Sequence, residues 1–407
     1  SLGWDDLHGG RPEVGLARLV EARELARGAG AVRSVVAALG GIGTAQRILR
    51  RHEESVATHR EELDLARSTG LRGLVGTAQS HLGNALWASG RHAEAAACHQ
   101  ASLAVARELE EPMREATAVG NLGLCLLEDG EFDRAAAQLG RQLELTRAMG
   151  YRRGEAIAQG NLANVERSSG RLARALALEE RHLALCAEID YARGLALGLM
   201  SRIETLLLLG DPEGALEVHG RCVEACVRAG LGKLSKELDE ERAQIALQLG
   251  DEATARACWA RRLANVEDAT DRRLAMPVHL ALGRFHVRAG RPTEALGHLR
   301  VAVAIARESP STRDLVLPLA WLARIERDAV AEAAATLDGL SSHLPHLTRL
   351  EAQHVLAHAT GDATRKVEAQ WLLDTLVAHA PPGRQGPMVE RVPLLREVRA
   401  GDDVLPA

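Results

Sequence analysis

The chain has 407 residues and a formal net charge of −5, so its overall charge gives no reason to expect a nucleic acid or an anionic membrane as partner. Hydrophobic residues make up 46% of the sequence but aromatic residues only 2%, which favours Ala- and Leu-rich helices over sheets. No apolar run approaches the roughly 20 residues that span a bilayer, and the six cysteines lack a disulfide-rich spacing. We therefore expect a cytoplasmic protein with reduced thiols.

A glycine recurs along most of the chain at a spacing of about 40 residues. A small residue follows each of these glycines by five positions, and an apolar–small pair such as Leu122 and Gly123 often precedes it. This self-similarity predicts repeated units of two helices, helix A before the glycine and helix B after it. The column consists of Gly10, Gly90, Gly130, Gly170, Gly210, Gly250 and Gly290, with Arg50 in its one gap.

In chain order, the array begins within a unit, because Leu2 and Gly3 already stand in register with the later apolar–small pairs. We expect residues 1–308 to form the array, with its first unit truncated and a further domain upstream in a longer polypeptide. The period weakens after residue 308. Residues 309–380 are predicted to be degenerate helical repeats that cap the array, and residues 381–407 a C-terminal tail.

These columns resemble the tetratricopeptide repeat, which combines Leu-Gly in helix A, glycine at the turn and alanine in helix B. The usual unit has about 34 residues, and this longer variant is similar to the tetratricopeptide regions of bacterial multidomain signalling and regulatory proteins. The resemblance implies an all-α, right-handed superhelical solenoid whose concave face is lined by helix A. It also implies that extended or helical peptides bind along that face.

Polar residues recur in helix A at nine and six positions before the turn glycine, although asparagine costs up to about 0.7 kcal/mol in a helix. At about 100° per residue these positions share one face, which predicts a polar stripe. An amide both donates and accepts, so the stripe suits a peptide backbone; alternatively, the amides bond one another and tie the repeats together. The candidate partner-binding residues are His81, Asn84, Asn121, Asn161, Asn164, Ser168 and Glu204.

A second column, near the start of helix A, is basic. It offers an anion-binding ladder, or each cation instead lies at the carbonyl end of the preceding helix B. The candidate anion-binding residues are Arg153, Arg193, Lys233 and Arg273. Separately, Arg202 and Arg242 replace a core leucine, and we expect them to pair with Glu204, Glu240 or Glu241.

Catalytic motifs are missing from the sequence. It contains no GxxxxGK[ST] phosphate loop, GxSxG elbow or HExxH zinc helix, and the glycine-rich run at 39–46 follows no predicted strand. The densest histidine group comprises His343, His346, His354 and His358, and it has no cysteine or suitably placed carboxylate. We therefore expect no metal, no cofactor and no enzymatic activity.

The leading interpretation is a protein- or peptide-binding scaffold, the sensor or partner-binding arm of a larger bacterial signalling or regulatory protein. Its partner would lie in the concave groove. The alternatives are a self-assembling structural scaffold, or a polyanion or nucleic-acid binder that uses the basic column. A nucleic-acid partner is disfavoured by the net charge, and no membrane partner is expected.

Overall fold

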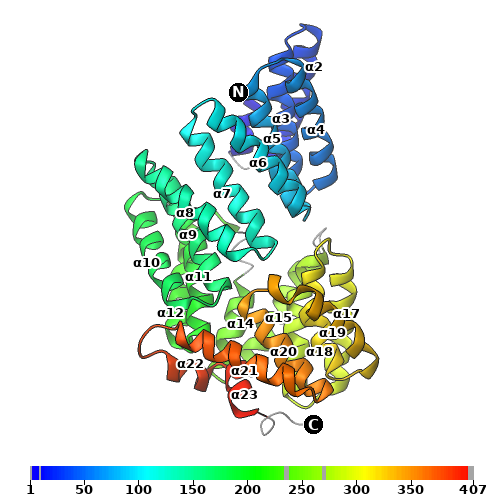
Figure 1. Ribbon diagram of the computed structural model, residues 1–407. Coiled ribbons are helices and arrows are strands. Elements are labelled where there is room, and N and C mark those ends of the chain that lie inside the picture. Colours follow the sequence, from blue (N-terminus) through cyan, green and yellow to red (C-terminus); the bar gives the residue numbers. More distant parts are fainter. Residues whose placement is uncertain (1, 9–10, 233–237, 268–271, 402–407) are drawn as a thin grey trace. The chain divides into compact units, whose positions relative to one another are not determined.

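The computed structural model describes residues 2–8, 11–232, 238–267 and 272–401, and within these ranges the regular secondary structure is entirely helical (Figure 1). The helices gather into two compact units, Ser1–Tyr151 and Arg152–Ala407, which we call the N-terminal and C-terminal units. Within each unit, successive helices pack against one another in sequence order. The predicted all-α solenoid of helix-turn-helix repeats is confirmed. The predicted boundaries at 308 and 380 stay predictions.

The N-terminal unit contains four repeats, each with a helix A followed by a helix B. Its helices are α1 (Leu2–His8), α2 (Pro12–Gly28), α3 (Val32–Ile48), α4 (His52–Ser68), α5 (Arg72–Ala88), α6 (His92–Glu108), α7 (Pro112–Glu128) and α8 (Phe132–Ala148).

The C-terminal unit continues the alternation and ends in a group of irregularly spaced helices. Its α-helices are α9 (Arg152–Ser168), α10 (Leu172–Glu188), α11 (Ala192–Leu208), α12 (Pro212–Arg228), α14 (Asp239–Gln248), α15 (Glu252–Glu267), α16 (Met276–Arg288), α17 (Pro292–Arg307), α18 (Val316–Ala323), α19 (Val330–Leu340), α20 (His346–Thr360), α21 (Ala363–Ala378), α22 (Gln385–Arg391) and α23 (Pro393–Ala400). Its short 3₁₀ helices are η1 (Arg272–Ala275), η2 (Thr312–Leu315), η3 (Arg327–Ala329) and η4 (Ser341–His343).

The turn glycines end helix A by adopting a left-handed backbone. Gly90 has φ of 80°, and the N–H of Arg91 donates to the carbonyl of Leu86 at 2.9 Å, while the Gly90 N–H donates to Trp87. This is the Schellman arrangement, which satisfies the last carbonyls of a helix. Arg50 holds the same left-handed conformation, with φ of 59°, where the glycine column has its gap. The repeat therefore keeps its turn geometry even without the favoured residue.

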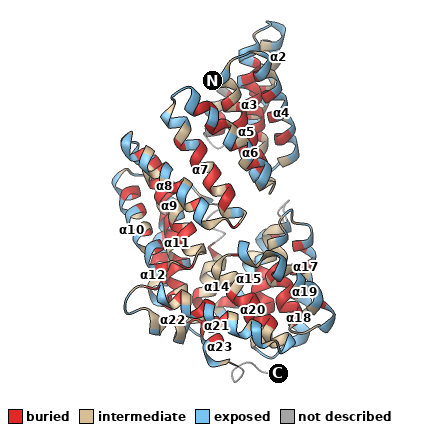
Figure 2. Cartoon of the chain, viewed as in Figure 1, coloured by how far each residue is buried: buried red, intermediate tan, exposed pale blue. Residues whose placement is uncertain are grey.

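Small residues allow close packing of helix A against helix B. A Cβ added at Gly123 of α7 would lie 2.7 Å from the Leu139 side chain of α8, so the glycine is required by its neighbour. Ala95 and Ala135, the predicted small residues of helix B, are fully buried. Figure 2 shows buried positions concentrated where helices face each other within each unit.

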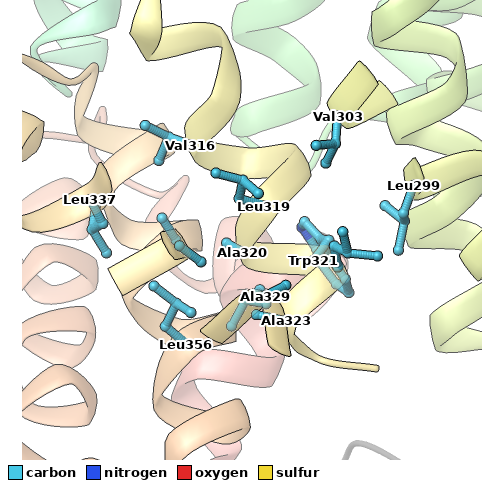
Figure 3. Packing of buried hydrophobic residues seen from close by; sticks show 14 of the residues in the cluster. Leu299, Val303, Val316, Leu319, Ala320, Trp321, Ala323, Ala329, Leu337 and Leu356 are labelled. Atoms are coloured by element: carbon cyan, nitrogen blue, oxygen red, sulfur yellow. The ribbon is translucent and has the colours of Figure 1, made fainter. Parts of the chain in front are cut away.

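Residues 309–380 contribute a large part of the core of the C-terminal unit. Trp321 of α18 is fully buried and packs in one cluster with Leu299 of α17 and Leu356 of α20 (Figure 3). A second cluster joins Leu172 and Leu209, which flank repeat turns, to side chains of α21, α22 and α23. The last helices thus cover apolar surface on repeats that precede them by more than 150 residues.

The segment predicted as a C-terminal tail contains α22 and α23. The backbone N–H of Ala173 donates to the carbonyl of His379 at 3.0 Å. A Cβ at Gly210 would lie 2.3 Å from the carbonyl oxygen of Pro387. The backbone of two repeat turns, near Ala173 and at Gly210, therefore lies directly against the backbone of residues 379–387. A side chain at Gly210 would prevent this contact.

Candidate binding cavity and polar clusters

The C-terminal unit contains an open cavity of about 730 Å³. Helix A residues from successive repeats line one side of it, among them Ser168 of α9, Glu204 of α11, Gln244 of α14 and Arg284 of α16. The other side is formed by the start of α20 and by α23 with the residues just before it, including Val392. The volume falls within the range of about 300–1,000 Å³ typical of ligand sites.

Charged groups of both signs face one another around this cavity. Arg167 Nη2 lies 2.7 Å from a carboxylate oxygen of Glu204, and Arg284 Nε lies 2.9 Å from Glu351. Trp321 Nε1 donates to Glu351 Oε1 at 2.7 Å, the same carboxylate oxygen that Arg284 Nε approaches. The ion pair between Arg284 and Glu351 is partly buried. Replacing either residue by a neutral one would therefore leave the charge of the other without its partner.

The last turn of the same helix, α16, carries a further pair. Arg288 Nε lies 2.8 Å from Glu397 Oε1, and the Arg288 guanidinium stands 5.0 Å from the centroid of the Trp321 ring. Glu397 belongs to α23 and is buried. This pair therefore fixes the last helix to the array, and it forms part of the cavity wall.

Of the predicted partner-binding residues, Ser168 and Glu204 line the cavity. Sequence reasoning missed Arg167, Arg288 and Glu397. Arg167 and Arg288 stand three and two residues before a turn glycine, on the helix A face that the repeat register defines, and this register was the one available signal. Glu397 lies outside the 40-residue period, so no repeat pattern marks it.

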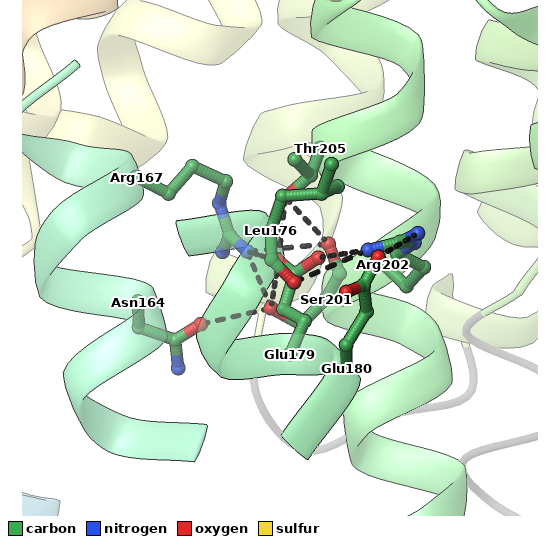
Figure 4. Close-up of polar contacts among 8 residues, drawn as sticks. All are labelled: Asn164, Arg167, Leu176, Glu179, Glu180, Ser201, Arg202 and Thr205. Atoms are coloured by element: carbon green, nitrogen blue, oxygen red, sulfur yellow. Dashed lines mark hydrogen bonds and ion pairs between the residues drawn. The ribbon is translucent and has the colours of Figure 1, made fainter. Parts of the chain in front are cut away.

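Asn164 lies beside the cavity residues in a polar cluster centred on Glu179 of α10 (Figure 4). Ser201 Oγ donates to Asn164 Oδ1 at 3.1 Å, and Thr205 Oγ1 donates to Glu179 Oε1 at 2.5 Å. Arg167 Nη1 stands 3.7 Å from Glu179. Burial raises the pKa of Glu179, and the bond from Thr205 and the arginine charges oppose that rise. The Asn164 amide thus links α9 to α11 rather than standing free.

The expected partners of Arg202 were wrong. Its guanidinium lies 3.7 Å from Glu179 and 3.4 Å from Glu180, both on the preceding α10, whereas Glu204 pairs with Arg167. The reason is geometric: Arg202 stands at a core-facing position of helix A, so its side chain points toward the preceding helix B, which packs against that face. Arg242 Nη1 has no hydrogen-bond partner within the described residues.

In the N-terminal unit, Asn121 Nδ2 donates to Asn84 Oδ1 at 3.2 Å, which links α7 to α5. His81, also on α5, has Nδ1 at 3.0 Å from a carboxylate oxygen of Glu62 on α4. Asn161, in the C-terminal unit, is half-buried on α9. Asn84, Asn121 and Asn164 therefore bond between repeats, as the second interpretation of the stripe expects, while recognition of a ligand stays a prediction.

The candidate anion-binding residues that the structure describes do not line the cavity. Arg153 and Arg193 are exposed, and the Arg153 guanidinium lies 4.4 Å from the centroid of the Tyr191 ring. Arg273 is half-buried. Lys233 lies outside the described residues. Anion binding by this column stays a prediction.

Potential metal ligands come together once among the described residues, at His59, Glu62 and His81. The densest histidine group of the sequence, which contains His354 and His358, is not among them; these two rings stack edge to face, with centroids 4.7 Å apart. No helix within the described ranges is long and apolar enough to cross a membrane.

The repeated helix pairs define an α-solenoid repeat protein. Residues 74–148 match the tetratricopeptide repeat family, which the glycine and alanine columns resemble. No curated protein matches the chain.

Solved structures share this fold at low sequence identity. Aspartyl phosphate phosphatase F from Bacillus subtilis is 11% identical with a TM-score of 0.56, over 70% of this chain and 74% of that one. The quorum sensor NprR from B. thuringiensis is 13% identical with a TM-score of 0.52, over 91% and 99%. A Rap protein complexed with competence and sporulation factor is 19% identical with a TM-score of 0.52, over 67% and 73%. At these identities the likeness shows the fold.

Proposed function

We propose that the chain is a peptide- or protein-binding scaffold of a regulatory protein, and that a segment of its partner binds in the cavity of the C-terminal unit. The observation that carries this proposal is the cavity itself, lined by helix A residues of successive repeats, including Ser168 and Glu204. Repeat arrays use such concave surfaces for binding because each unit presents equivalent positions to one long groove.

The chemistry of the cavity walls favours a peptide over a small apolar ligand. Gln244 and Gln248 bring amides that can both donate to and accept from a peptide backbone. Leu208, Leu247 and Leu347 add apolar surface for side chains. Because the cavity carries charges of both signs in pairs, it suits a partner with mixed charge better than a polyanion.

The structural neighbours support a regulatory role at the level of the fold. One is a quorum sensor, and another is a Rap protein solved in complex with competence and sporulation factor. A solenoid of this kind can therefore hold a partner in a regulatory protein. We extend that role to this chain as a proposal, with binding rather than catalysis as its activity and the cytoplasm, where its six free thiols would stay reduced, as its location.

The test selects ligands from a phage-displayed library of random peptides on the full chain. Affinity of the selected peptides is then measured by fluorescence anisotropy for the native chain and for Gln244→Ala and Ser168→Leu, two changes in the cavity wall. We expect each change to weaken binding by about tenfold, which corresponds to about 1.4 kcal/mol.

The matched control is Gln100→Ala, since Gln100 is exposed on α6 of the N-terminal unit and does not line the cavity. It should bind the selected peptides as the native chain does. Selection of no peptide, or of peptides that all three variants bind with native affinity, would overturn the cavity as the binding site.

A further inference from the structure

Three side chains with metal-ligating atoms converge in the N-terminal unit. His59 and Glu62 stand three apart on α4, and His81 comes from the adjacent α5. His59 Nδ1 lies 2.7 Å from Glu62 Oε2, and His81 Nδ1 lies 3.0 Å from Glu62 Oε1. One nitrogen or oxygen from each of the three residues falls within 4.8 Å of the others. The group thus has the compactness that a shared ion requires.

Glycines of α3 leave the space that this group occupies. A Cβ at Gly40 would lie 2.8 Å from Glu62 Oε1, and a Cβ at Gly43 would lie 2.5 Å from His59 Nε2. Both glycines belong to the run at 39–46, which follows no strand and holds no phosphate loop. Its function in the structure is to make room for the carboxylate and the imidazole rings.

Two of the three side chains are buried, and the third is partly exposed to solvent. The side chains of His59 and Glu62 are each 2% exposed, whereas that of His81 is 26% exposed. Packing therefore fixes the two α4 ligands, as a metal site requires of its protein ligands. His81 gives an ion from solvent a way to reach them.

The neighbouring repeat shows that this set is not a consequence of the repeat itself. Forty residues on, the equivalent positions hold His99, Ser102 and Asn121. Ser102 donates instead to the carbonyl of Gly76, at 2.9 Å, and His99 Nδ1 has no hydrogen-bond partner among the described residues. Only one imidazole remains there, so this position lacks the ligands for an ion.

We propose that His59, Glu62 and His81 bind a divalent transition-metal ion, Zn²⁺ in the first place, as three protein ligands with a further coordination position open. Two imidazoles and one carboxylate are a known zinc ligand set, with Zn–N distances of about 2.0–2.1 Å and Zn–O distances of about 2.0–2.2 Å. The ion would compensate the buried negative charge of Glu62, which otherwise has only hydrogen bonds with the two imidazoles. It would also join α4 to α5 and stabilise this junction, independently of any partner in the cavity.

The experiment uses the full chain without a histidine tag, stripped with EDTA and titrated with ZnCl₂ by isothermal titration calorimetry. Bound metal is also counted by elemental analysis after dialysis. We expect one Zn²⁺ per chain and a rise in melting temperature on binding. Co²⁺ in place of Zn²⁺ should give the visible absorption of a low-coordinate site.

Two variants and a control decide the location. His81→Gln changes a partly exposed ligand that the fold can lose, and His59→Gln changes a buried one; each should weaken Zn²⁺ binding by about 100-fold or more. His99→Gln, at the equivalent buried position of the next repeat, should keep native affinity. No tight Zn²⁺ binding by the native chain, or native affinity in both ligand variants, would overturn the proposal.

Discussion

The amides of the repeated asparagines lie where one repeat meets the next. Asn121 donates to Asn84, and Asn164 accepts from Ser201, in each case between two A helices of one unit. A hydrogen bond between partly buried groups contributes about 1 kcal/mol, which offsets the up to about 0.7 kcal/mol that asparagine costs in a helix. The residue-scale pattern is therefore accounted for by contacts between repeats, whether or not a ligand also uses these amides.

Buried histidines at the same scale make the fold sensitive to acid. His99 on α6 is 1% exposed, and its ring fills the space beside Gly83, where a Cβ would lie 2.6 Å from Cε1. Burial lowers the pKa of His99 from 6.5 to about 4. Between these values the unfolded chain takes up a proton that the folded chain does not, so stability is fully present above pH 6.5 and falls as the pH drops toward 4.

We predict that this histidine contributes about 3 kcal/mol of the stability lost between pH 7 and pH 4. Urea unfolding of the native chain and of His99→Gln, measured across that range, checks it. The variant starts less stable at pH 7 because its amide is buried, and the gap between the two proteins should narrow as the pH falls. A gap that stays constant with pH would contradict the assigned titration.

At the scale of elements, each helix pair depends on small residues at its crossing point. Gly123 of α7 meets Leu139 of α8, and Gly283 of α16 meets Leu299 of α17, where an added Cβ would lie 2.7 Å and 2.5 Å from the leucine side chain. Since protein interiors are close-packed, these leucines fill the space that the glycines leave. The column of small residues in the sequence thus reflects the short distance at which the two helices of a pair cross.

Gly123→Ala is therefore expected to destabilise the chain by about 1–3 kcal/mol, because the extra methyl group forces α7 and α8 apart. Gly140→Ala is the matched control on α8. No atom lies within 4 Å of a Cβ at Gly140, so helix propensity alone should act there and raise stability by up to about 1 kcal/mol. Opposite shifts of the urea midpoint in the two variants are the expected result, and equal shifts would refute the packing argument.

For the molecule as a whole, long-range contacts matter most in the C-terminal unit. α23 pairs Glu397 with Arg288, and its Leu395 is fully buried in the cluster that contains Leu172 and Leu209. The repeats of this unit are thus not stabilised by their nearest neighbours alone, unlike those of an ideal linear array. The residues of α23 thus line part of the cavity wall, and the segment just before them contacts the repeat turns.

Leu395→Ala should accordingly lower stability by about 2–5 kcal/mol, the range for a leucine removed from a packed core. Leu197→Ala on α11 is the control, since Leu197 is 43% exposed and should change stability by no more than about 0.5 kcal/mol. Thermal unfolding followed by circular dichroism measures both. If Leu395→Ala left the transition unchanged, α23 would not be an integral part of the unit.

The sequence by itself determined the repeat, the helices and their turns. Glycine at the left-handed position of Gly90 and a small residue at Gly123 act through local geometry and nearest-neighbour packing, so their spacing is legible along the chain. The face of helix A was also predictable, and it placed Ser168 and Glu204 in the cavity wall.

Only the tertiary structure decided which groups meet across long separations. Arg284 and Glu351 stand 67 residues apart in sequence, and Arg288 and Glu397 stand 109 apart. Neither acidic partner belongs to the 40-residue period, so no periodic signal could pair them. The curvature of the array brings them together, because the small rotation at each helix pair accumulates along the chain until distant segments touch.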